Sequence, residues 1–358
     1  MRLKNSLRCI LVIIVGTSIA TSCKKTPVEV PEFDKAELLN NLATNLIVPA
    51  LNDFDNKLNT LKTNFDVFEA DRTSANLEIV RTNWKAAYSV WQSAKIYDFG
   101  PVYDNGFKSA TGTFPSDISE IQSNISDGGY NLSSASNVDA IGLSALDYLF
   151  YQATALNDFV SDENYTIYAS ELIDKMVSES SVVKSGWTSY RGTFLASTGT
   201  EITSAFSLLI NEFNKDYELS KNAKLGIPIG RQSLGIQLPE YIETRNSAYS
   251  FDLLRQSIVS LQGLYNGDNN SSSGSGVGFH EYLLHLERTD LANDINSNFN
   301  SIISKIDSFQ NSLEVEMGSN ESELDELYNL IQQQVVNLKT DMTSAFGVLI
   351  TYQDNDGD

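Results

Sequence analysis

Apolar residues recur at intervals of three and four along most of this chain, which is the spacing of one buried helical face. An early stripe runs through Leu51, Phe54, Leu58, Leu61, Phe65 and Phe68, and an aromatic one through Leu77, Val80, Trp84, Tyr88 and Trp91. Strand-like alternation is rare. Its best example, residues 348–352, is equally explained by an extended tail. The pattern predicts an all-α protein, and its short connections favour antiparallel bundles.

Two breaks in the helical pattern suggest how the chain is divided. Residues 127–137 are rich in Gly, Ser and Asn and predict a loop that leads into a central apolar stretch. Residues 224–230, which read Lys-Leu-Gly-Ile-Pro-Ile-Gly, interrupt the pattern a second time. We therefore expect two helical bundles, over residues 34–225 and 226–358.

The central stretch, residues 139–151, is the sharpest local signal in the sequence. Asp147 lies among Leu and aromatic residues, and Ser144 is three positions earlier, so a helix would place both on one face. A carboxylate in such a run is costly to bury unless it is paired, hydrogen-bonded or bound to a cation. Spacing alone favours a buried Ser and Asp satisfied by other protein groups, and the alternative is a ligand or metal site.

An internal similarity links this stretch to a later one. Residues 142–151 align without gaps on residues 276–285, and the Gly, the acid, the Tyr and the Leu coincide. A glycine- and serine-rich segment precedes each. The similarity suggests that the two bundles are related by duplication.

The N-terminus has the layout of an export signal. Basic residues precede a short apolar run, and small residues then lead to Cys23. This ending resembles a bacterial lipobox, so we expect a signal peptide over residues 1–22, lipidation of Cys23 and a tether over residues 23–33. Acyl chains would hold the protein to a membrane. The expected location is the cell envelope, lipid-anchored in the outer membrane and facing the periplasm or the surface.

Charge and cysteine content exclude several classes of function. Removing residues 1–22 takes away three positive charges and no acids, so the formal net charge changes from −21 to −24. Such an acidic chain argues against nucleic-acid binding, which needs a basic face. Because Cys9 belongs to the signal, the mature chain keeps only Cys23, which excludes an internal disulfide and thiol catalysis.

The two histidines do not form a zinc motif. His280 and His285 are five residues apart, roughly 140° out of phase on a helix, so they do not share a face. The sequence has no His-Glu-x-x-His segment. A Ser-His-Asp site has no supporting Gly-x-Ser-x-Gly context either.

Several segments together resemble one bacterial family, the imelysin-like proteins. The segments are Trp84-Lys-Ala-Ala-Tyr-Ser-Val-Trp91, Phe99-Gly-Pro101, Phe114-Pro-Ser-Asp117, the central stretch, Leu225-Gly-Ile-Pro-Ile-Gly230, and an ending that reads Phe346-Gly-Val-Leu-Ile-Thr-Tyr352 with Asp356-Gly-Asp358. The family comprises exported helical proteins and includes a reported insulin-cleaving membrane peptidase and iron-uptake-associated proteins. The resemblance implies two bundles with a functional pocket between them.

The family's hallmark is Gly-x-His-x-x-Glu, which is proposed to bind metal. Here it falls on Gly142-Leu-Ser-Ala-Leu-Asp147, so Ser144 replaces the His and Asp147 replaces the Glu. Serine is a poor ligand for Zn²⁺ or Fe²⁺ beside imidazole. The resemblance places Gly142, Ser144, Asp147, Tyr148 and Asp117 in the pocket, with Asp147 as the metal ligand for iron, zinc or calcium.

We therefore favour a non-catalytic, lipid-anchored binding protein linked to uptake of iron, haem or another nutrient, acting with an envelope uptake system. The alternative is a metal-dependent peptidase, which would need a metal-activated water and a general base. A third interpretation is a surface adaptor whose pocket has lost its function.

Overall fold

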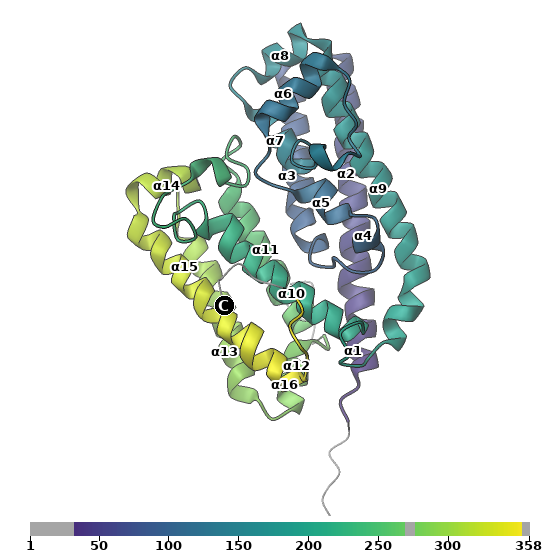
Figure 1. The fold of residues 1–358 in the computed structure, drawn as a ribbon, viewed down its shortest axis with the longest axis vertical. Helices are drawn as coiled ribbons and strands as arrows, with labels where there is room; N and C mark the ends of the chain where they lie inside the picture. The colour runs from purple at the N-terminus through teal and green to yellow at the C-terminus, as the bar shows by residue number, and fades with distance from the viewer. Residues whose placement is uncertain (1–31, 269–275, 353–358) are drawn as a thin grey trace, which may run out of the picture. The chain divides into compact units, whose positions relative to one another are not determined.

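Helices form all the regular structure in the part of the chain that the structure describes, and no strand occurs there. The computed structural model describes residues 32–268 and 276–352, and Figure 1 labels its helices. The all-α prediction is confirmed.

The elements of the first part are α1 Lys35–Leu42, the π-helical turn η1 Ala43–Ile47, α2 Val48–Ala70, α3 Ser74–Ala94, α4 Pro101–Asp104, α5 Phe107–Gly112, α6 Ile118–Asp127, the 3₁₀ turn η2 Ala135–Asn137, α7 Gly142–Tyr151, α8 Ala155–Ser161 and α9 Glu163–Ala196. Those of the second part are α10 Ala205–Lys221, η3 Asn222–Gly226, η4 Pro239–Tyr241, α11 Ser250–Asn266, α12 Phe279–His285, α13 Thr289–Ile306, α14 Leu313–Ser319, α15 Glu321–Val335, η5 Val336–Met342 and α16 Thr343–Phe346.

Polar caps fix where the main helices begin. The side chains of Thr73 and Asp117 accept hydrogen bonds from backbone N–H groups in the first turns of α3 and α6. Ser204 does the same for α10. Each cap satisfies a donor that the helix itself leaves without a partner.

The first group of helices is α2, α3 and α9, which pack along one another. The predicted apolar stripe of α2 is buried, and Phe54 contacts Trp91 of α3 with ring centroids 4.9 Å apart. The short helices α5 and α7 pack on this group through α9 and α3. Large aromatic side chains, among them Phe54 and Trp91, are therefore fully buried beside aliphatic residues in this core.

The second group contains α10, α11, α13 and α15. Helix α11 packs on α13, α13 on α15, and α10 on both α11 and α15. The two groups meet where α11 packs on α3, within the single compact unit Asp34–Asp358. The proposed division at residue 225 and the duplication stay predictions.

Helix α9 continues through Gly186 to Ala196, where Trp187 and Phe194 bury a further face. At Gly186 an added Cβ would lie 2.8 Å from the Cβ of Pro101, so the glycine permits close packing of α4.

Residues 348–352 form no strand. They pair instead with the side chain of Asn211, which donates to the Leu349 carbonyl oxygen at 3.0 Å and accepts from the Thr351 N–H at 2.8 Å. The Tyr352 hydroxyl also donates to Glu218 at 2.9 Å, so two side chains of α10 hold the extended tail.

Within residues 32–268 and 276–352, no helix combines the length and the hydropathy needed to cross a bilayer. The expected signal peptide, Cys23 and most of the tether lie outside the described residues.

Candidate functional site

Helix α7 is the central stretch of the sequence, and Gly142 fixes its start. Gly142 has φ of +79°, a conformation that residues with a Cβ rarely adopt. An added Cβ would also lie 2.4 Å from the carbonyl oxygen of Thr111 in α5. The glycine therefore permits the close approach of α7 to α5.

Asp147 is almost fully buried, and its carboxylate is held by protein N–H groups. Asn246 donates from its backbone N–H and its side-chain amide to Oδ2, each at 3.0 Å, and the Ser247 N–H donates to Oδ1 at 3.1 Å. Burial raises the pKa of Asp147, and these hydrogen bonds oppose the rise. The carboxylate thus links α7 to the segment that leads into α11.

The other predicted site residues have separate partners around α7. Ser144 accepts a hydrogen bond from the Ser116 hydroxyl at 2.8 Å. Tyr148 accepts one from Gln122 at 2.6 Å, and burial raises the pKa of its phenol. Asp117 caps α6. These contacts do not bring Gly142, Ser144, Asp147, Tyr148 and Asp117 together around one cavity.

The donor set at Asp147 does not fit a metal ion. Both carboxylate oxygens already accept N–H hydrogen bonds, and the hydroxyl of Ser144 is engaged with Ser116. Across residues 32–268 and 276–352, no three His, Cys, Asp or Glu side chains are placed to hold a metal. His280 is on α12, with Nδ1 at 2.9 Å from Glu281. Iron, zinc or calcium binding at Asp147 remains a prediction that this geometry does not favour.

A cavity of about 380 Å³ lies where α3 and α5 face α10 and η3. We call it the lysine cavity, because Lys95, Lys108, Lys215 and Lys224 line it. Asp98 and Glu243 contribute carboxylates to the lining, and Trp91, Tyr103 and Phe114 contribute aromatic surface. Charged groups from distant parts of the sequence therefore meet here.

The ion pair between Lys95 and Asp216 beside the lysine cavity is buried. The Lys95 ammonium lies 2.6 and 2.5 Å from the two carboxylate oxygens of Asp216, and the side chains are 5% and 0% exposed. Burial lowers the pKa of Lys95 to about 8. The charge of Asp216 opposes this decrease, whereas the charges of Lys224 and Lys108 add to it. Burial also opposes ionisation of Asp216, but the three lysines lower its pKa below the ordinary value. Asp216 is therefore a carboxylate at neutral pH.

Lys224 forms the second buried pair. Its ammonium bonds to the carboxylate of Glu243 and lies 5.3 Å from the ring centroid of Phe114. Glu243 is three residues before Asn246, so one short segment joins this pair to Asp147. Tyr88 lies between them: burial raises the pKa of its phenol, and the charges of Glu243 and Asp147 raise it further.

Lys108 differs from the other lysines because its charge is balanced but its N–H donors are not used. Its Nζ lies 3.6 Å from Asp216 and 3.8 Å from Glu212, beyond hydrogen-bond distance. Among the described residues, this shielded nitrogen has no hydrogen-bond partner. Burial alone would lower the pKa of Lys108, but the nearby carboxylates raise it. Lys108 is therefore a shielded cation whose capacity to donate hydrogen bonds is unused among the described residues.

Sequence reasoning missed these lysines and Asp216, although a signal was present. Lys95 continues the spacing of Trp84, Tyr88 and Trp91, which places it on the buried face of α3. A lysine in phase with a core stripe needs a buried partner, and that partner lies 121 residues away on α10.

Comparison with known proteins supports the fold and the family. The chain is similar to the crystal structure of a putative iron-regulated protein A precursor from Parabacteroides distasonis ATCC 8503, with a TM-score of 0.76, 15% identity, and coverage of 88% of this chain and 96% of that one. It is also similar to an imelysin-like protein from Psychrobacter arcticum 273-4, with a TM-score of 0.71, 13% identity, and coverage of 89% and 97%. No curated protein matches the sequence. The family model of imelysin (peptidase M75) matches residues 47–342, and the chain belongs to the imelysin family.

Proposed function

We propose that this imelysin-family chain is a non-catalytic binding protein of the cell envelope and that its ligand occupies the lysine cavity. The observation that supports the proposal is Lys108, which belongs to the lining of a cavity of about 380 Å³ and whose shielded ammonium has no hydrogen-bond partner among the described residues. A buried donor without a partner costs about 1–3 kcal/mol, and an anionic ligand would remove that cost.

Each lining lysine has a carboxylate within 4 Å, so the unused donors of Lys108 are what favour a small anion. Four lysines line the cavity, and its volume is at the small end of the range of roughly 300–1,000 Å³ for ligand sites. Neither His280 nor His285 lines it, so it offers no imidazole to the iron of a haem. We propose a small carboxylate ligand, free or as an anionic iron chelate. A structural relative described as iron-regulated makes an iron-containing ligand the first to test.

The alternative function is a metal-dependent peptidase. Such an enzyme needs a metal with an open coordination position and a general base. The hydrogen-bonded state of Asp147 and Ser144 gives this alternative no specific support. Zn²⁺-dependent cleavage of casein that is lost in Asp147→Ala would favour it over the binding function.

Lipid anchoring completes the proposal. Basic residues, a short apolar run and Cys23 have the order of a lipoprotein signal. We propose that the protein is held to an envelope membrane by acyl chains on Cys23 and passes its ligand to an uptake system. Cys23→Ser should move the protein from the membrane fraction to the soluble fraction, and an unchanged distribution would argue against the anchor.

Calorimetry with citrate, alone and with Fe³⁺, tests the binding function. Loss of one charge-assisted hydrogen bond, worth about 1.5–3 kcal/mol, should weaken binding by roughly tenfold to a hundredfold in Lys108→Met. Lys57→Met is the matched control, because Lys57 is on α2 and does not line the cavity. Equal binding by both variants, or no binding by the unmodified protein, would contradict the proposal.

A further inference from the structure

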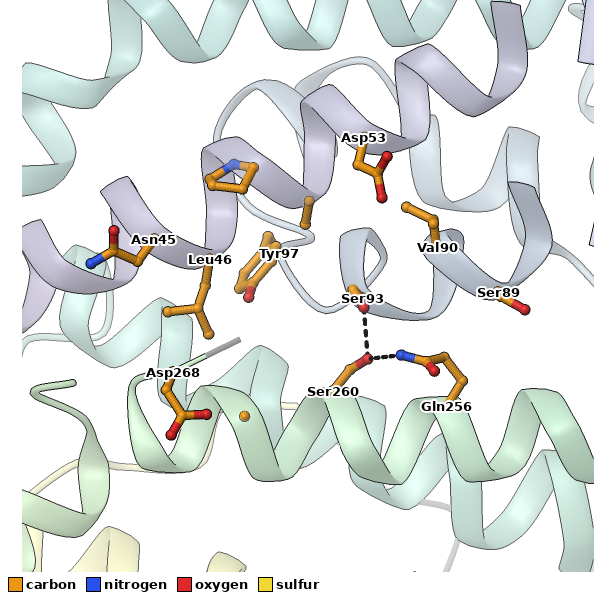
Figure 2. Close-up of a pocket in the computed structure, with 13 residues that line it drawn as sticks. Asn45, Leu46, Asp53, Ser89, Val90, Ser93, Tyr97, Gln256, Ser260 and Asp268 are labelled. Carbon is orange, nitrogen blue, oxygen red and sulfur yellow. Dashed lines mark hydrogen bonds between the residues drawn. The ribbon is translucent and has the colours of Figure 1, made fainter. Parts of the chain in front are cut away.

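A second cavity lies at the junction of α2, α3 and α11, and its chemistry is the opposite of the lysine cavity. Its volume is about 490 Å³, and Figure 2 shows the side chains around it. Asp53 and Asp268 are its ionisable carboxylates, and no Lys, Arg or His is among the lining residues. We call it the acidic cavity.

Asp53 gives the acidic cavity a solvent-exposed carboxylate that pairs with no described residue. It belongs to α2, and Figure 2 places its carboxylate beside the cavity. Among the described residues, this carboxylate has no hydrogen bond or ion pair, in contrast to Asp55 two positions later, which pairs with Lys184. The local field therefore favours a cation.

Tyr97 is a second and independent sign of a ligand. The residue is only 2% exposed, and its hydroxyl faces the cavity in Figure 2 without a hydrogen-bond partner among the described residues. Burial raises the pKa of Tyr97, so the phenol stays neutral. The hydroxyl opens on the cavity, so a ligand N–H could donate to it. Its ring can also attract a cation through the π face.

The remaining walls suit a ligand that is part polar and part aliphatic. Ser93 and Ser260 share a hydrogen bond of 2.7 Å, and Gln256 donates to Ser260 at 3.2 Å, which gives a continuous polar wall. Leu46 and Val90 supply apolar surface. A bare divalent ion would need about six or more oxygen ligands, and no cluster of three candidate metal-binding side chains occurs in residues 32–268 and 276–352.

We propose that the acidic cavity binds a small aliphatic amine. Its ammonium group would pair with Asp53, one of its N–H groups would donate to the Tyr97 hydroxyl, and its carbon stem would lie against Leu46 and Val90. The ammonium supplies the charge that the lining lacks, and the stem covers the apolar wall. A neutral sugar would satisfy the hydroxyl groups but would leave the charge of Asp53 unbalanced. This site is separate from the lysine cavity and does not depend on it.

Calorimetry on the full chain tests the proposal with putrescine as the amine and glucose as a neutral comparison. Asp53→Asn should weaken putrescine binding by about tenfold, because it removes one partly solvated contact between opposite charges. Tyr97→Phe should weaken it by a few fold and keep the buried ring. The matched control is Glu69→Gln, which removes one charge from α2 about 24 Å along the helix from Asp53.

Each result decides for or against the site. Putrescine binding that falls in Asp53→Asn and Tyr97→Phe but not in Glu69→Gln would support it. Equal weakening by Asp53→Asn and Glu69→Gln would mean general attraction to an acidic surface and would overturn it. Glucose binding without putrescine binding, or no binding of either compound, would also overturn it. The thermal unfolding midpoint of each variant identifies losses caused by misfolding.

Discussion

Helix α7 and the lysine cavity both contain buried charge, but they use it differently. At α7, three N–H donors satisfy Asp147. In the lysine cavity, Lys95 is fully paired with Asp216, whereas Lys108 keeps donors that no described residue accepts. A buried charge whose hydrogen bonds are complete supports the fold, and one with unused donors can also bind a ligand.

The same contrast separates α7 from the later segment that resembles it. The acid of α12, Glu281, accepts a hydrogen bond from the Gly278 N–H at the start of its own helix. Asp147 instead bonds across to Asn246, 99 residues away. Similar sequences thus place their acids in different roles, one local and one joining distant segments.

The largest expected effect is on the buried pair of the lysine cavity. Asp216→Asn would leave the Lys95 ammonium buried without its partner, so the free energy of unfolding should fall by about 3–5 kcal/mol. Urea denaturation measures it. The double variant Lys95→Met/Asp216→Leu should recover most of the loss. A single variant as stable as the unmodified protein would show that the pair is not buried in solution.

The next effect concerns Asp147. Asp147→Ala would leave three N–H donors without an acceptor and should lower the free energy of unfolding by about 3 kcal/mol. Asp139→Asn, three residues before α7, is the control and should change it by less than about 0.5 kcal/mol. Equal stability of the two variants would contradict a structural role for Asp147.

The pH dependence of this site has a defined sign. Burial raises the pKa of Asp147 in the folded protein above its unfolded value of about 3.9. The resulting contribution to the free energy of unfolding is therefore complete below the unfolded pKa and is lost as the pH rises through the folded-state pKa. The unmodified protein should therefore gain stability relative to Asp147→Asn on acidification from neutral pH. Denaturation curves of both proteins at several pH values measure this difference, and a constant difference would contradict the raised pKa.

A smaller effect is expected on the pH dependence of ligand affinity, which the titration of Lys95 should cause. Because burial lowers the pKa of Lys95 to about 8, a smaller fraction of its ammonium remains at pH 9 than at pH 7. Affinity for citrate should fall by up to about tenfold between pH 7 and pH 9, and Lys95→Met should remove this dependence. Calorimetry at the two pH values checks it. An equal fall in Lys95→Met would assign the titration to another group.

The smallest effect is at Ser144. Its hydrogen bond from Ser116 is between neutral groups, so Ser144→Ala should cost about 1 kcal/mol of unfolding free energy. It should leave citrate affinity unchanged. A loss of affinity comparable to that of Lys108→Met would move the ligand site to α7.

Periodicity predicted the helices well, because a buried face constrains every third or fourth residue of the same element. It predicted the buried stripes of α2 and α3. It gives no information on Gly186, where the missing Cβ lets α9 approach Pro101.

The candidate site was harder to predict, because its members come from distant segments. The sequence shows that Asp147 is unusual, but the donors of Asn246 and Ser247 become visible only after folding. Lys95 could have been identified from its phase in α3, whereas its pairing with Asp216 requires the packing of α3 against α10.

Retained iron, measured by mass spectrometry after incubation with ferric citrate and gel filtration, tests the central claim most directly. The unmodified protein and Asp147→Asn should both retain iron in stoichiometric amounts, and Lys108→Met should lose it. Retention by Lys108→Met together with loss in Asp147→Asn would contradict the account and place the ligand site on α7.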